Sequence, residues 1–243
     1  MRKPLPRQQS GFTLVEIAIV LVIIGLLLGG VLKGQELINS AKVKNFATDF
    51  RNIPLFIYGY QDRFHALPGD DKNVANHITG GVKANTPATS GGVACAGGDC
   101  TGNGVIDGTW QDLANSGSET TLFWQHVRLA GLAAGPTSTA DPNYLPLNTD
   151  GGTIGIESGA AATGGAYIGA DAATGTQALT PTYLVCSSGI LGKFAKQLDT
   201  MMDDGNTATG SVRVVPMNQA RGAAALATAN VNDSTSYIVC MGL

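Results

Sequence analysis

The chain has 243 residues, a formal charge of −3 and 44% hydrophobic residues, enough for one moderate domain plus an extended element. No basic run lies outside the N-terminal region, which argues against nucleic acid as a partner. The apolar residues are unevenly distributed. A long apolar run lies near the start, whereas the remainder is rich in Gly, Ala and Thr, a composition that predicts a loop-rich domain around a small core.

The N-terminal region has a short basic segment followed by the apolar run. Residues 12–32 span 21 positions with a single charge, Glu16, and about 20 apolar residues cross the hydrocarbon core of a bilayer. Arg2, Lys3 and Arg7 precede the run, so the positive-inside rule predicts a cytoplasmic N-terminus. A secretory signal shares this layout but ends at a small-x-small cleavage site, and residues 28–33 offer a poor one. We therefore expect residues 12–32 to be a transmembrane helix.

Glu16 is an anomaly inside this run. A carboxylate within a hydrophobic span costs a few kcal/mol and usually has a partner there, although near the interface it could instead reach toward water. Its setting is Gly11-Phe12-Thr13-Leu14-Val15-Glu16, which closely resembles the type IV prepilin signature. The combination of this motif with a basic leader and an apolar run is specific to that family.

The resemblance implies how the N-terminus is processed and used. Prepilin peptidase would cleave after Gly11, which makes residues 1–11 a leader peptide, and Phe12 would become the N-methylated first residue. Glu16 would then be the fifth residue and would meet the N-terminal amine of a neighbouring subunit. The implied partners are the peptidase, other pilin or pseudopilin subunits and, before assembly, the inner membrane.

The helix is expected to continue beyond the membrane as an amphipathic segment, residues 33–64. An apolar stripe recurs there at alternating spacings of three and four. Its members are Val43, Phe46, Phe50, Ile53, Ile57, Tyr60 and Phe64. Pro54 should kink this helix or end its regular part, because proline removes a backbone donor and clashes one turn back.

Residues 65–243 are predicted to form a periplasmic or extracellular head. Strands are expected at residues 153–157, 166–170, 182–186, 211–215 and 236–241, because these stretches are rich in Val, Ile or Tyr or alternate in polarity. Helices are expected at residues 119–132 and 188–203. The fold class is therefore α+β and type IV pilin-like, a long N-terminal helix packed on a small antiparallel sheet with irregular loop insertions.

The four cysteines predict disulfides. An even number beyond a membrane segment suits an oxidising compartment, and zinc is the rival interpretation. We expect Cys95 to pair with Cys100 across a tight loop and Cys186 to pair with Cys240 between two strand candidates, although two other pairings are possible in principle.

A calcium site is predicted in the loop Asp99-Cys-Thr-Gly-Asn-Gly-Val-Ile-Asp107. Oxygen-bearing side chains at alternate positions, with glycine at the sixth, imitate the first half of an EF-hand loop. The expected ligands are Asp99, Thr101, Asn103, the carbonyl of Val105 and Asp107, with Asp112 or Glu119 replacing the missing glutamate at the twelfth position. The alternative is a turn-rich loop that uses Asp, Asn and Gly for their backbone freedom.

His126 and a cluster of three aspartates are further candidate site residues. His126, within the helix predicted at 119–132, is interpreted as a structural histidine because no positioned nucleophile accompanies it. Asp199, Asp203 and Asp204 gather at a helix C-terminus, where negative charge is unfavourable. They indicate either a second cation site or a hydrogen-bonded turn.

The expected function is that of a structural, non-enzymatic subunit of a type IV pilus or a type II secretion pseudopilus, either a minor pilin or a pseudopilin. The expected location is the bacterial inner membrane, with a single pass and a periplasmic head, and then the filament. The alternative is a membrane-anchored periplasmic enzyme or sugar-binding domain, which a deep polar pocket in the head would favour.

Overall fold

The computed structural model describes residues 14–85, 101–114, 117–159 and 165–243. It divides into two compact units, Met1–Ala41 and Lys42–Leu243, and the second is called the C-terminal unit below. The division falls inside the long N-terminal helix, so each unit contains part of it.

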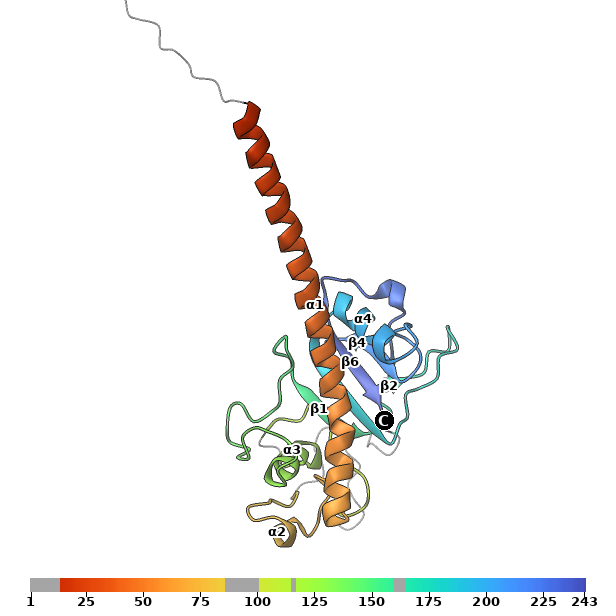
Figure 1. Cartoon of the computed structure of the whole chain (residues 1–243). Helices are drawn as coiled ribbons and strands as arrows, with labels where there is room; N and C mark the ends of the chain where they lie inside the picture. The colour runs from red at the N-terminus through yellow and green to blue at the C-terminus, as the bar shows by residue number, and fades with distance from the viewer. Residues whose placement is uncertain (1–13, 86–100, 115–116, 160–164) are drawn as a thin grey trace, which may run out of the picture. The chain divides into compact units, whose positions relative to one another are not determined.

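The helix α1 spans Leu14–Phe64 without interruption (Figure 1). Its first half has the composition and length of a membrane-crossing helix, and its most apolar stretch is not buried. Pro54 lies inside the helix, so the prediction that it could end the regular part is wrong. Ile53 and Ile57 are both buried beside it, and their packing offsets the hydrogen bond that proline removes.

The C-terminal unit is built on a four-stranded antiparallel sheet in the order β1-β3-β6-β4. The strands are β1 (Ile154–Ser158), β3 (Tyr183–Leu191), β4 (Val212–Pro216) and β6 (Ser236–Gly242). A separate parallel pair joins β2 (Ile168–Gly169) and β5 (Ala223–Ala224). The long helix and the small antiparallel sheet confirm the predicted α+β, pilin-like fold class.

Short helices complete the C-terminal unit: α2 (Val74–His77), α3 (Glu119–Leu129), α4 (Gly192–Met202) and the 3-10 turn η1 (Thr228–Asn230). The helix predicted from residue 188 begins four residues later than expected, because β3 continues to Leu191. A register shift between Ser187 and Ile190 lets β3 keep pairing with β6. Gly189 lies within that shift with a φ of +74°, a conformation that glycine adopts without strain.

The main core of the C-terminal unit lies between α1 and the sheet. The predicted stripe is buried from Val43 to Tyr60, and Phe64 is half-buried. Five stripe residues, together with Ala47, share one cluster with side chains of β1, β3, β4 and β6. Those sheet side chains are Ile154, Ile156, Val185, Ile190, Val212, Val214, Tyr237, Val239 and Met241. Burying each large apolar side chain stabilises the fold by about 1.5–3 kcal/mol, so this interface holds the unit together.

Cys186 and Cys240 form a disulfide between directly opposed positions of β3 and β6. This confirms the predicted pairing, which ties the last strand to the centre of the sheet. Cys95 and Cys100 lie outside the described residues, so their pairing stays a prediction.

Candidate functional site

The predicted processing site lies at the very start of α1. Gly11 and Phe12 are outside the described residues, whereas Glu16 lies in the first turn of α1. A carboxylate in this turn interacts favourably with the positive end of the helix dipole. Beyond it, the large apolar side chains from Ile17 to Leu32 are exposed, so this surface needs lipid or other protein to cover it.

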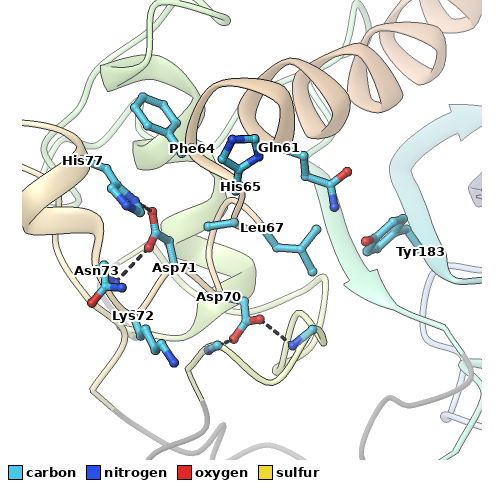
Figure 2. A pocket seen from close by; sticks show the side chains of 13 residues that line it. Gln61, Phe64, His65, Leu67, Asp70, Asp71, Lys72, Asn73, His77 and Tyr183 are labelled. Atoms are coloured by element: carbon cyan, nitrogen blue, oxygen red, sulfur yellow. Dashed lines mark hydrogen bonds and ion pairs between the residues drawn. The ribbon is translucent and has the colours of Figure 1, made fainter.

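A second site of interest centres on Asp70, a residue outside the predicted calcium loop. Its side chain is only 3% exposed. One carboxylate oxygen accepts a hydrogen bond from the Gly102 N–H, and the other accepts one from the Gly104 N–H at 2.7 Å (Figure 2). The first oxygen also accepts a hydrogen bond from the Asn103 N–H at 3.2 Å. Gly102 and Gly104 have φ values of +81° and +84°, and this conformation lets nearby N–H groups converge on one anion.

Hydrogen bonds of Asn103 fix the conformation of the loop from Asn103 to Asp107. Asn103 closes the turn, because its Oδ1 accepts from the Val105 N–H at 2.7 Å and its Nδ2 donates to an Asp107 carboxylate oxygen at 2.9 Å. Asp107 is half-buried. The structure therefore places Asn103, Val105 and Asp107 in one compact loop.

Glu119, the first residue of α3, points into this region and is 1% exposed. Its Oε2 accepts a hydrogen bond from the Asp107 N–H at 2.7 Å, whereas its Oε1 has no hydrogen-bond partner. Its carboxyl group lies within hydrogen-bonding reach of the Asp70 carboxyl. Burial raises the pKa of Glu119 to about 9, and the charges of Asp70 and Asp107 raise it while the Asp107 N–H lowers it.

A close backbone approach brings Asp70 to Glu119. Gly69 has a φ of +92°, and a Cβ at this position would lie 2.4 Å from the Glu119 carbonyl oxygen. Its N–H donates to His126 Nδ1 at 2.9 Å, and His126 Nε2 donates to the Val82 carbonyl at 2.8 Å. Both ring nitrogens of His126 therefore form hydrogen bonds with backbone groups, as expected of a structural histidine.

The other predicted ligands are distributed unevenly. Asp112 accepts hydrogen bonds from Thr109 and Thr120 and closes a separate turn. Thr101 is half-buried beside the loop, and Asp99 lies outside the described residues. The sequence reasoning missed Asp70. The available signal was a pair of adjacent carboxylates after a Pro-Gly turn, which recurs too often to identify a ligand.

Asp71, the neighbour of Asp70, shows what a fully satisfied buried carboxylate looks like here. It accepts hydrogen bonds from the Tyr60 hydroxyl at 2.8 Å and the Asn73 N–H at 2.9 Å, and its Oδ2 lies 2.6 Å from His77 Nδ1. Both carboxylates line a cleft of about 780 Å³ (Figure 2). Polar and apolar groups line the cleft in nearly equal measure, and its two acidic side chains already accept hydrogen bonds from other parts of the protein.

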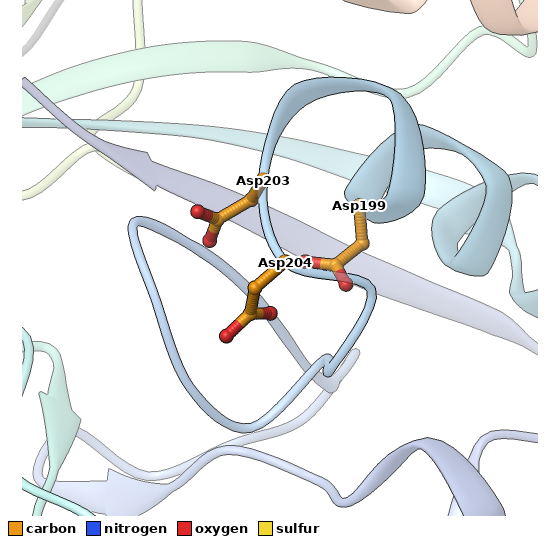
Figure 3. A group of neighbouring side chains, drawn as sticks. All are labelled: Asp199, Asp203 and Asp204. Atoms are coloured by element: carbon orange, nitrogen blue, oxygen red, sulfur yellow. The ribbon is translucent and has the colours of Figure 1, made fainter.

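A third acidic group lies at the end of α4, where the ligand atoms of Asp199, Asp203 and Asp204 fall within 4.8 Å of one another (Figure 3). Asp203 accepts from the Val212 N–H at 2.8 Å, and Asp204 accepts from the Asn206 N–H and the Thr209 hydroxyl, each at 2.8 Å. These contacts match a hydrogen-bonded turn.

Asp199 is the exception in this group. It is fully buried, and neither of its oxygens accepts a hydrogen bond of normal geometry. Burial raises the pKa of Asp199 to about 7, the charges of Asp204 and Asp203 add to the rise, and the nearby Gly205 N–H lowers it. Arg213 lies near Asp203 and Asp204 but instead bonds the carbonyls of Gly210 and Gln177.

Comparison with known proteins identifies the N-terminal segment. Residues 6–32 match the family model of the prokaryotic N-terminal methylation motif, which is the prepilin-type signature of type IV pilins and pseudopilins. The match confirms the resemblance predicted from residues 11–16. No curated protein and no solved structure matches the chain.

The raised pKa of Asp199 predicts a pH-dependent stability. The folded state holds this proton up to about pH 7 and the unfolded state only to about pH 4, so stability should fall as pH rises between these values. Each unit of pKa difference corresponds to about 1.4 kcal/mol. Asp199→Asn should flatten this part of the pH profile and raise the free energy of unfolding at pH 8, measured by urea denaturation with a chelator present. An unchanged profile in the variant would contradict the prediction.

Proposed function

We propose that this protein is a structural subunit, a minor pilin or a pseudopilin, of a type IV pilus or a type II secretion pseudopilus. The observation that carries the proposal is the methylation motif at residues 6–32, continuous with the apolar first half of α1. A small sheet packed on the second half of the same helix is the arrangement expected of such a subunit.

Assembly follows from the surface of α1. Its exposed apolar side chains are stable in lipid, where a helix satisfies all of its own backbone hydrogen bonds. In the filament the same side chains pack against the helices of neighbouring subunits. Cleavage after Gly11 would remove three basic residues, Arg2, Lys3 and Arg7. These charges hold the N-terminus on the cytoplasmic side before assembly, and their loss allows the helix to leave the membrane.

Glu16 is proposed to select the packing of neighbouring helices. A carboxylate in an apolar span costs a few kcal/mol, and pairing it with an opposite charge offsets that cost. The N-terminal amine of a neighbouring subunit, created when the leader is cleaved before Phe12, supplies that charge. Packing of the helices would then be favourable only after leader cleavage, so cleavage would have to precede assembly.

The cleft lined by Asp70 and Asp71 favours a second candidate function, binding of a small polar molecule such as a sugar by the C-terminal unit. This binding function would either accompany the filament role or be an alternative to it. A screen of sugars against the full chain in detergent tests it: a rise in melting temperature that His77→Ala removes would support binding at the cleft, and no rise would argue against it.

The processing step predicts a defined mature N-terminus. Intact-mass and peptide mass spectrometry of protein from native membranes should find a chain that begins at N-methylated Phe12. A secretory signal would instead give a chain that begins after Leu32, and that outcome would exclude a pilin-like role.

The pairing of Glu16 predicts an assembly defect without a processing defect. Glu16→Ala removes the charge that favours a partner amine, so membrane insertion and leader cleavage should remain normal while incorporation into sheared filaments falls several-fold. Immunoblots of the membrane and filament fractions measure both.

Glu36→Ala is the matched control on the same helix. Glu36 is 68% exposed and pairs with Lys33 at 2.6 Å, and an exposed pair of this kind contributes little. The control should assemble normally. Equal incorporation of both variants would show that Glu16 has no part in assembly.

A further inference from the structure

Asp199 is a buried carboxylate whose retention in the core needs an explanation. Its side chain is 0% exposed, and neither oxygen accepts a hydrogen bond of normal geometry, although the Gly205 N–H lies nearby. Figure 3 shows this side chain extending from the last turn of α4 toward Asp204. A buried polar atom without a partner is costly, and more so when the group is charged. The Asp199 carboxylate therefore needs a partner, and the described residues supply none of normal geometry.

The carboxylate oxygens nearest to Asp199 are those of Asp203 and Asp204. One oxygen from each of the three side chains lies within 4.8 Å of the other two, and no other group of acidic, histidine or cysteine side chains among the described residues meets this condition. Two oxygens bound to one calcium ion are separated by at most about 4.6–5.2 Å, twice the calcium–oxygen distance. The three carboxylates are therefore close enough to share one ion.

The protein does not compensate the negative charge of this group. Within the described ranges no Lys or Arg forms an ion pair with any of the three aspartates, and the last turn of α4 contains no basic residue. Arg213 lies near Asp203 and Asp204, but its guanidinium donates to backbone carbonyls instead. Carboxylates at a helix C-terminus face the negative end of the helix dipole, where a cation is favourable.

The loop after α4 holds two of the three carboxylates in place. Asp203 accepts a hydrogen bond from the Val212 N–H, and Asp204 accepts two, from the Asn206 N–H and the Thr209 hydroxyl. A carboxylate offers about four acceptor positions, so positions remain on both side chains for an ion. Because the loop fixes these side chains before an ion arrives, less conformational entropy is lost on binding.

The donor atoms decide which cation fits. All three side chains offer only oxygen, which hard cations prefer, and calcium takes six to eight oxygen ligands in flexible geometry. Magnesium is usually held by one or two carboxylates and keeps several waters. Zinc prefers nitrogen and sulfur ligands, which this group lacks. Three carboxylates at one place therefore favour calcium.

We propose that Asp199, Asp203 and Asp204 bind one calcium ion, with loop oxygens and water completing its shell. The ion would join the end of α4 to the loop that leads into β4. These residues are distinct from the calcium loop predicted at residues 99–107, where calcium binding stays a prediction. The proposal does not depend on the filament role.

The stability of the C-terminal unit should then depend on calcium, because an ion that binds only the folded state stabilises it by mass action. The full chain, purified in detergent at pH 8 and stripped with EDTA, should melt at a higher temperature in millimolar calcium chloride than in EDTA. Magnesium chloride should give a clearly smaller rise. Isothermal titration calorimetry with calcium chloride measures the affinity directly.

Asp199→Asn is the decisive variant, because it keeps the shape of the side chain and removes its charge. Calcium affinity should fall at least about tenfold, the scale of loss seen when even the partners of metal ligands are altered. In EDTA at pH 8 the variant should melt at or above the wild-type temperature, since a buried charge without a partner is gone, and calcium should no longer raise it. A merely structural carboxylate would leave the calcium effect the same in both proteins.

Asp204→Asn repeats the test at an exposed position, where folding is least at risk, and should also weaken calcium binding. Glu119→Gln is the matched control, since Glu119 is another buried carboxylate with an unpartnered oxygen, and it should keep the full calcium effect. Three results would overturn the proposal: no calcium effect in the wild type, as expected if Asp199 only holds a proton; an undiminished effect in both cluster variants; or an effect lost only in Glu119→Gln.

Discussion

The packing of α1 against the four-stranded sheet is the interaction on which the C-terminal unit depends. Five residues of one helical stripe enter the same cluster as side chains from all four strands. The short helices α3 and α4 add further large side chains to the same cluster, among them Phe123, Trp124 and Phe194. One helix therefore supplies a wall of the core over its second half and exposes apolar side chains over its first half. A helix of this kind cannot be soluble alone, so its composition already requires a lipid or protein environment.

Several carboxylates are buried beside this apolar core, and they differ in how many hydrogen-bond or ion-pair partners they have. Asp71 is satisfied by Tyr60, Asn73 and His77, and Glu157 is paired with Arg221. The Oε1 of Glu157 nevertheless has no partner, and Glu119 and Asp199 also retain buried oxygens without partners. Such oxygens cost stability.

The two proposals concern separate parts of the chain and different physical problems. In the proposed filament, Glu16 would make an apolar interface depend on a charge that only the processed neighbour presents. In the C-terminal unit, the problem is that carboxylates are buried with oxygens that have no hydrogen-bond partner.

The sequence alone determined the features that depend on local pattern. Four features could be recognised directly, because each follows from a motif or a short periodicity: the motif from Gly11 to Glu16, the apolar run, the stripe of α1 and the Val- and Ile-rich strands. The pairing of Cys186 with Cys240 followed from placing both on strands.

Tertiary structure alone decided the rest. Ser188 to Leu191 extend β3, because pairing with β6 outweighs the helical pattern. Pro54 remains within α1, because the core holds the helix on both sides of it. Asp70 meets Glu119 only because Gly69 lets two segments distant in sequence touch, and no local pattern encodes a contact across 49 positions.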